Sequence, residues 1–219
     1  MCGIAGVIQR RGSPVERDLL LGMVQTLGHR GPDGAGLFSD EEVGLAHRRL
    51  SILDLESGQQ PMQSGDGSLQ VTYNGEIFNY RELREELSEK GHRFRTASDT
   101  EVLLALYLEY GADCVHRMNG QWAFAIFDAR DRSLFLSRDR VGICPLYFTK
   151  TRGPESAFVF ASEIKALLRH PCVRAELDLE ALAQIFTLWH TLEERTLFRG
   201  IHQLPPCLLY TSPSPRDCN

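Results

Sequence analysis

The sequence predicts a layered α+β domain whose sheets are mostly antiparallel. Short runs of strand-forming residues are joined by tight turns, and segments with helical spacing of apolar residues lie between them. The length of 219 residues suffices for one substantial domain with its own core and is too short for two large ones. No internal repeat interrupts the pattern.

The first half of the chain alternates predicted strands and helices. Strands are predicted at residues 3–8, 43–47 and 69–73. Apolar residues recur at helical spacing in the three predicted helices, 14–27, 80–90 and 100–110. Ser98 or Asp99 is the expected N-cap of the third helix. A glycine-rich loop is expected at residues 29–36.

The second half is predicted to contain a series of short strands followed by two helices. The strands are expected at 121–128, 133–138, 145–149 and 157–161, with a hairpin connection at 129–132. The helices are expected at 163–168 and 179–189.

The domain is expected to span residues 1–206, and the last 13 residues, 207–219, are expected to be unstructured. Ser212-Pro213-Ser214-Pro215 disfavours regular structure, and no apolar periodicity remains in this tail. Deleting it is therefore expected to change the free energy of unfolding by less than about 0.5 kcal/mol.

Charge and hydropathy argue against several kinds of partner. The 24 basic and 29 acidic residues give a net charge of -5, and no basic stripe follows any predicted helix, so we expect no nucleic acid and no membrane partner. No apolar run approaches the ~18 residues that span a bilayer. The apolar start of the chain is short, lacks a basic leader and ends at Arg10 and Arg11, which does not fit a signal peptide. A cytoplasmic location is expected.

The cysteines give no sign of a disulfide framework or a metal site. They are scattered and contain no C-x-x-C pair, at Cys2, Cys114, Cys144, Cys172, Cys207 and Cys218. Such cysteines are usually small buried apolar residues. The position of Cys2, directly after the initiator methionine, is unusual.

Cys2 has two interpretations, a small residue that opens a buried strand and a nucleophile. Removal of Met1 would leave one residue that carries both a thiol and a free α-amine. The unperturbed pKa of that amine is about 7.7–8.0, which suits a base near neutral pH. A nucleophile activated by its own N-terminal amine can carry out covalent catalysis.

Three further polar positions also have a structural and a chemical interpretation. Asn74-Gly75 is a strong hairpin-turn signal, or else its amide and N–H groups form an oxyanion hole. In the second case Gly75 would be needed so that the backbone can approach a substrate. Arg49 and Asp99 are a strand-end charge and a helix cap, or together a cation and an anion for a zwitterionic amino acid.

An ordered series of motifs resembles the class II glutamine amidotransferase domain of glutamine-hydrolysing asparagine synthetases. The motifs are MCGIAG at 1–6, HRGPDG at 29–34, HRRLSI at 47–52, YNGEIFNY at 73–80 and SDTE at 98–101. Later segments agree, namely FAIFD at 124–128, RDRVGI at 138–143, PLY at 145–147 and ASEIKAL at 161–167. The resemblance implies an N-terminal-nucleophile hydrolase fold, a four-layer αββα sandwich.

The resemblance also implies roles for individual residues in the hydrolysis of L-glutamine to glutamate and ammonia. Cys2 would attack the side-chain amide and form a thioester, and Asn74 and Gly75 would hold the oxyanion. Arg49 would bind the substrate α-carboxylate, and Glu76 and Asp99 its α-ammonium group. The backbone of four residues would line the pocket, namely Leu50, Ser51, Ile52 and Leu53. His29 to Asp33 mark the family, and no chemical step is assigned to them.

The sequence departs from the family pattern in two places. Cys144 stands where a lysine is usual, and after Pro206 the family continues with a glycine and a second, ATP-using domain. The tail here instead looks like frame-shifted or adapter sequence, and the Ser-Gly-Gly-x-Asp-Ser nucleotide loop is missing. We therefore expect no cofactor in this chain, with ATP and Mg²⁺ bound by the absent parent synthetase domain, and a homodimer is possible.

Two rival interpretations stay open. The same domain occurs in glucosamine-phosphate synthase and phosphoribosylpyrophosphate amidotransferase, although Pro32-Asp33 favours the asparagine synthetase branch. The other rival is a catalytically idle domain retained for subunit contacts, which the intact Cys2, Asn74 and Gly75 disfavour.

Overall fold

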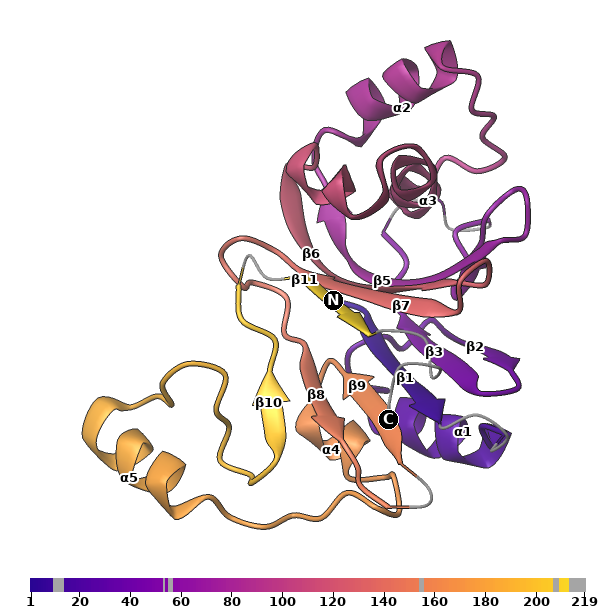
Figure 1. Cartoon of the computed structure of the whole chain (residues 1–219). Coiled ribbons are helices and arrows are strands. Elements are labelled where there is room, and N and C mark those ends of the chain that lie inside the picture. Colours follow the sequence, from indigo (N-terminus) through magenta and orange to yellow (C-terminus); the bar gives the residue numbers. More distant parts are fainter. Residues whose placement is uncertain (10–13, 53, 55–56, 154–155, 207–208, 213–219) are drawn as a thin grey trace.

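The computed structural model describes residues 1–9, 14–52, 54, 57–153, 156–206 and 209–212. Two antiparallel sheets stack face to face, and helices cover their outer faces (Figure 1). The six-stranded first sheet has the order β10-β8-β9-β1-β3-β2, and the five-stranded second sheet has the order β11-β7-β6-β5-β4. In the described part of the chain, no helix is both long enough and apolar enough to cross a membrane.

The strands of the first sheet come from both ends of the chain. They are β1 (Gly3–Gln9), β2 (Gly34–Asp40), β3 (Val43–Arg49), β8 (Tyr147–Lys150), β9 (Ala157–Ala161) and β10 (Ile201–Gln203). The second sheet is built mostly from the middle of the chain. Its strands are β4 (Met62–Gln63), β5 (Leu69–Ile77), β6 (Gly120–Asp128), β7 (Ser133–Arg138) and β11 (Leu209–Ser212).

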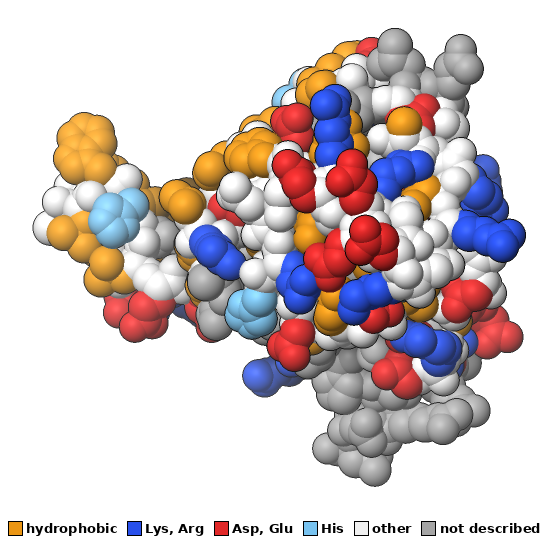
Figure 2. All heavy atoms as spheres, turned by 90° about the horizontal axis from the view of Figure 1, so that it is seen from above, with side chains coloured by type: hydrophobic (Ala, Val, Ile, Leu, Met, Phe, Trp, Pro, Cys, Tyr) orange, Lys and Arg blue, Asp and Glu red, His pale blue; other side chains and the backbone are white. Residues whose placement is uncertain are grey.

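Helices lie outside both sheets. The first sheet carries α1 (Arg17–Gln25) and α4 (Ile164–Leu167), and the second carries α2 (Tyr80–Glu89), α3 (Asp99–Tyr110) and a 3₁₀ turn, Gly111–His116. A further helix, α5 (Leu179–Leu188), projects from the body and buries only Ala181 (Figure 1). Exposed apolar side chains, among them Phe186 and Trp189, gather on this projection, whereas acidic and basic side chains intermix on the face that carries α2 (Figure 2).

Three apolar cores separate four layers. Leu20 and Met23 of α1 pack on Val7 of β1 in the outer core of the first sheet. In β6, Phe124 and Ile126 face α3, whereas their neighbours Ala125 and Phe127 face the first sheet. This alternation is the period of a strand buried on both faces. The predicted four-layer αββα sandwich is confirmed.

Most predicted elements are confirmed, with shifts at their ends. The first helix begins at Arg17 and not at Pro14, and Ser98 is the N-cap of α3, its hydroxyl accepting the Thr100 N–H at 3.1 Å. The expected loop at 29–36 is wrong in part, because β2 begins at Gly34. The short strands β4 and β10 were not predicted, since two or three residues show no period.

The prediction of an unstructured tail is wrong for Leu209–Ser212. These residues form β11, which pairs antiparallel with β7 so that Leu209 lies opposite Ser137 and Ser212 opposite Leu134. The exposed edge of β7 offers backbone hydrogen-bonding groups that a short segment can use whatever its apolar pattern. Residues 207–208 and 213–219 lie outside the described part of the chain.

Candidate functional site

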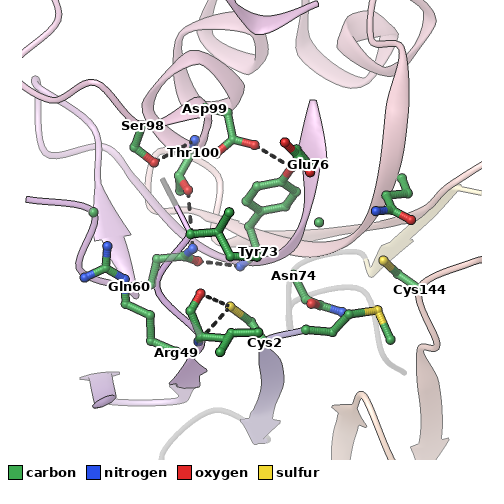
Figure 3. A pocket seen from close by; sticks show the side chains of 16 residues that line it. Cys2, Arg49, Gln60, Tyr73, Asn74, Glu76, Ser98, Asp99, Thr100 and Cys144 are labelled. Carbon is green, nitrogen blue, oxygen red and sulfur yellow. Dashed lines mark hydrogen bonds between the residues drawn. The ribbon is translucent and has the colours of Figure 1, made fainter. Parts of the chain in front are cut away.

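A pocket opens where the N-terminus of the chain meets the ends of β3 and β5 and the start of α3 (Figure 3). Residues from all four segments line it, including Cys2, Arg49, Asn74, Gly75, Glu76 and Asp99. Leu50 and Ile52 line it as well. The structure therefore brings together eight of the ten site residues that the sequence predicts.

The two remaining predicted residues are Ser51 and Leu53. Ser51 is not among the lining residues of this pocket, and its N–H donates to Asp33 Oδ2 at 2.8 Å, so its place in the lining stays a prediction. That bond connects the HRGPDG loop to the segment after β3. Leu53 lies outside the described residues.

The Cys2 thiol lies half-buried at one end of the pocket. Its Sγ accepts the Leu50 N–H at 3.3 Å and lies 3.6 Å from the Leu50 carbonyl oxygen. Burial raises the pKa of this thiol, and the Leu50 N–H, the terminal amine, Arg49 and Arg30 oppose that rise only in part. Such a thiol does not ionise unaided at neutral pH, so it needs a base to become a nucleophile.

Arg30 holds the main chain of Cys2, a contact that the sequence did not predict. Its Nε donates to the Cys2 carbonyl at 2.9 Å, and its Nη1 donates to Glu163 Oε1 at 3.1 Å. The next residue, Gly31, passes so close to β3 that a Cβ atom would lie 2.4 Å from the Arg48 carbonyl carbon and oxygen. The HRG motif marked this loop in the sequence, but the motif does not indicate which residues Arg30 contacts.

Asn74 lines the pocket with a side-chain amide whose N–H donor has no described hydrogen-bond partner. The residue is buried on β5, and its Nδ2 has no hydrogen-bond partner among the described residues. A buried donor without a partner is costly and uncommon in folded proteins. Figure 3 shows Cys2 between Asn74 on one side and Arg49 on the other.

The N–H of Gly75 also points into the pocket. Its neighbours on the same side of β5 both donate away from β6, Tyr73 N–H to Gln60 Oε1 at 2.7 Å and Ile77 N–H to Asp99 Oδ2 at 3.1 Å. N–H groups alternate in direction along an antiparallel strand, so the Gly75 N–H lies between these two and points the same way. Asn74 and Gly75 thus offer two donors on one side of the pocket.

The hairpin-turn explanation for Asn74-Gly75 is wrong. The pair forms no hairpin turn, because β5 continues to Ile77 and pairs with β6 throughout. That Gly75 also lets the backbone approach a substrate stays a prediction, because packing alone already requires a glycine there. A Cβ atom there would lie 2.2 Å from the Gln121 carbonyl oxygen and 2.7 Å from Trp122 Cα, so close packing against β6 requires the glycine.

Opposite charges lie on separate walls of the pocket. The buried guanidinium of Arg49 donates through Nη2 to the Asp54 carbonyl. Asp99 is buried, and its Oδ2 accepts the Tyr73 hydroxyl at 2.8 Å as well as the Ile77 N–H. Burial raises the pKa of the Asp99 carboxyl, and nearby Glu76 adds to that rise. A cation and two acidic side chains that line one pocket suit a zwitterion.

Two further residues complete the walls. Gln60 bridges β5 and α3, because its Oε1 accepts the Tyr73 N–H and its Nε2 donates to Thr100 Oγ1 at 3.3 Å. Cys144 is buried, and burial raises the pKa of its thiol to about 11. Its N–H and carbonyl are held by Asp139 and Arg138 at 2.9 and 2.8 Å, contacts that do not depend on its side chain. Among the described residues, no His, Cys, Asp and Glu side chains cluster as a metal site.

Comparisons with solved structures agree with the four-layer fold. Glutamine phosphoribosylpyrophosphate amidotransferase from Bacillus subtilis, complexed with ADP and GMP, matches with a TM-score of 0.62 and 20% identity over 97% of this chain and 49% of that one. The allosteric regulatory enzyme of purine biosynthesis matches with a TM-score of 0.64 and 24% identity over 77% of this chain and 43% of that one. At these identities the likeness establishes the fold alone.

Sequence comparisons establish the family. Glutamine-hydrolysing asparagine synthetases 3 and 1 of Bacillus subtilis are each 41% identical to the chain, over 94% and 96% of its length. The chain spans only 34% and 33% of these relatives, about a third of their length. The sequence model of the glutamine amidotransferase domain matches residues 1–215, past the domain end predicted at 206. The chain therefore belongs to the glutamine amidotransferase domain family.

Proposed function

We propose that the chain hydrolyses L-glutamine to glutamate and ammonia through a thioester on Cys2. The observation that carries this proposal is the uncommitted Asn74 amide beside the Gly75 N–H, in the same pocket as the Cys2 thiol. Two such donors form the arrangement that stabilises an oxyanion, and the thiol lies in the same pocket to create it.

Glutamine would bind with its α-carbon groups between the charged walls. Arg49 would hold the α-carboxylate, while Glu76 and Asp99 would hold the α-ammonium group. The side-chain amide would then extend toward Cys2, because the thiol lies between Arg49 and Asn74 (Figure 3).

The chemistry would need no group beyond the chain, the substrate and water. After Met1 is removed, the α-amine of Cys2 takes the thiol proton, and Sγ attacks the amide carbon. Asn74 Nδ2 and the Gly75 N–H stabilise the oxyanion. When the C–N bond breaks, the protonated amine gives its proton to the leaving ammonia. Water then attacks the thioester carbon while the amine takes a proton from the water. The Cys2 sulfur leaves as glutamate forms and takes that proton from the amine.

In a longer parent protein, the ammonia would serve the ATP-dependent synthesis of asparagine from aspartate. The names of the relatives support this destination, as does their length, about three times the share that the chain spans. ATP and Mg²⁺ would bind in that additional part, and this chain would require no cofactor. We place the protein in the cytoplasm, since its scattered cysteines suit a reducing compartment. A homodimer stays a prediction.

The direct test is to treat the purified chain with an electrophilic glutamine analogue and measure its intact mass. We expect a protein without Met1 that carries one adduct on Cys2, together with glutamate release from L-glutamine and no asparagine formed with ATP and aspartate. A Cys2→Ala chain, which keeps a small residue after Met1, should show neither adduct nor hydrolysis. Full activity in protein that retains Met1 would refute the mechanism, and an inactive wild type would favour an idle module.

A further inference from the structure

Glu163 lies outside the pocket but is connected to it through one side chain. It follows β9 and precedes α4, and its neighbour Ser162 binds β1 at Ile4 through two hydrogen bonds, of 2.8 and 3.0 Å. Those bonds place Glu163 beside the start of β1, where its Oε1 accepts Arg30 Nη1 at 3.1 Å.

Arg30 has two acceptors in the described structure. Its Nε donates to the Cys2 carbonyl at 2.9 Å, its Nη1 donates to Glu163, and its Nη2 is buried with no partner among the described residues. The orientation of the guanidinium therefore depends on Glu163 on one side and on the nucleophile's main chain on the other. Fixing the Cys2 carbonyl fixes the peptide plane next to the residue that carries both thiol and amine.

Glu163 remains ionised in this setting. Burial acts to raise the pKa of its carboxyl, but hydrogen bonds from Lys165, Arg30 and His29 outweigh burial and hold that pKa below its usual value. The side chains of His29 and Lys165 are 54% and 49% exposed, so solvent weakens their contacts with Glu163, whereas Arg30 is 11% exposed. The contact with Arg30 is thus the one best shielded from water.

We infer that Glu163 is a positioning residue for glutamine hydrolysis, which orients Arg30 and through it the Cys2 main chain. The inference rests on the proposed function. Among the described residues, Glu163 pairs with His29, Arg30 and Lys165 and with none of the proposed substrate-binding residues or oxyanion donors. Its loss should therefore affect the reaction of bound substrate and leave binding intact.

The test is a Glu163→Gln chain assayed for glutamine hydrolysis. We expect kcat to fall about 10-fold, because small displacements of a reacting group lower rates strongly, while KM stays within about twofold. Glu163→Asp keeps the charge and should retain more of kcat than Glu163→Gln. The matched control is Glu109→Gln, since Glu109 accepts Lys90 and His92 at 2.9 and 3.2 Å on α3 and is 31% exposed against 24% for Glu163.

A Glu163→Gln kcat equal to that of Glu109→Gln would overturn the inference. So would a kcat loss matched by a rise in KM, or by a fall in melting temperature that Glu163→Asp does not reverse, since either would indicate a merely structural role. If the wild type neither hydrolyses glutamine nor forms the Cys2 adduct, the proposed function itself fails. If the wild type is active and Glu163→Gln has the same kcat as the wild type, only the positioning role is contradicted.

Discussion

At the scale of single residues, the side-chain amide of Asn74 has an N–H donor that no described protein group satisfies. Leaving a buried donor without a partner costs about 1–3 kcal/mol, and Asn74 Nδ2 has none among the described residues. A transient oxyanion would satisfy this donor only during the reaction. An interaction made only in the transition state accelerates the chemical step without tightening substrate binding.

The first prediction concerns this amide. Asn74→Ala should lower kcat for glutamine hydrolysis by ~10²–10³ with little change in KM, because it removes one oxyanion donor. Steady-state kinetics measure both constants. Asn79→Ala is a suitable control, since the amide of Asn79 binds Arg117 and Asn119 outside the pocket. An unchanged kcat in Asn74→Ala would mean that the amide has no part in the reaction.

The second prediction concerns the opposite end of the substrate. Loss of a charge-assisted contact costs roughly 1.5–3 kcal/mol, so Arg49→Ala should raise KM for glutamine about 10- to 150-fold and change kcat much less. Asp99→Ala should also weaken glutamine use, but Asp99 additionally holds the Tyr73 hydroxyl and the Ile77 N–H, so Arg49 gives the cleaner test. A fall in kcat at constant KM would place Arg49 in the chemistry and not in binding.

At the scale of elements, β5 shows where local pattern and tertiary pairing disagree. Asn and Gly are poor strand residues, so the sequence predicted a strand that ends at Tyr73. In the fold β5 pairs with β6 from Leu69 opposite Asp128 to Ile77 opposite Gly120. The partner strand overrides the local preference and turns Asn74-Gly75 into part of the pocket wall.

Long periodic elements were predictable, and the contacts between them were not. The apolar spacing identified α2, α3, β1 and β6 to within a residue or two at their ends. The family motifs predicted most of the residues that line the pocket, because the resemblance assigns them roles in one site. Arg30 and Gln60 were missed as contacts, since their partners Cys2 and Thr100 lie 28 and 40 residues away along the chain.

The third prediction concerns a histidine between the two sheets. His47 of β3 is fully buried, and its Nδ1 lies 3.2 Å from the hydroxyl of Thr72 on β5, which donates to the Ala46 carbonyl. Burial, then the charge of Arg49, lowers the pKa of His47 to about 3 from its ordinary value of 6.5. The unfolded chain therefore binds a proton that the folded chain rejects, and stability present above pH 6.5 is lost as pH falls toward 3.

Between pH 7 and pH 5 this one residue should cost roughly 2 kcal/mol in the free energy of unfolding. Urea unfolding at the two pH values measures the loss. His47→Gln removes the titrating group, so its unfolding free energy should vary less over the same interval. An equal pH dependence in both chains would assign the acid sensitivity to other groups.

At the scale of the whole molecule, the last strand closes the second sheet. β11 covers the edge of β7. Truncation at Pro206 should therefore lower the free energy of unfolding by more than the ~0.5 kcal/mol expected for deletion of an unstructured tail. The uncovered edge should also promote association. Thermal melting and light scattering would compare chains ending at 206, 212 and 219. Equal melting of the first two would show that β11 adds no stability.

The two tryptophans lie in opposite environments, one beside the projecting helix α5 and the other inside the sandwich. Trp189, directly after α5, is 92% exposed, whereas Trp122, opposite Gly75 on β6, is 2% exposed and donates its indole N–H to Ser137 at 3.0 Å. Their fluorescence should therefore separate, with long-wavelength emission that iodide quenches from Trp189 and short-wavelength, protected emission from Trp122. In a Trp189→Phe chain, the remaining signal comes from β6, the strand paired with Asn74 and Gly75. If glutamine binds as proposed, this signal would measure its binding without turnover.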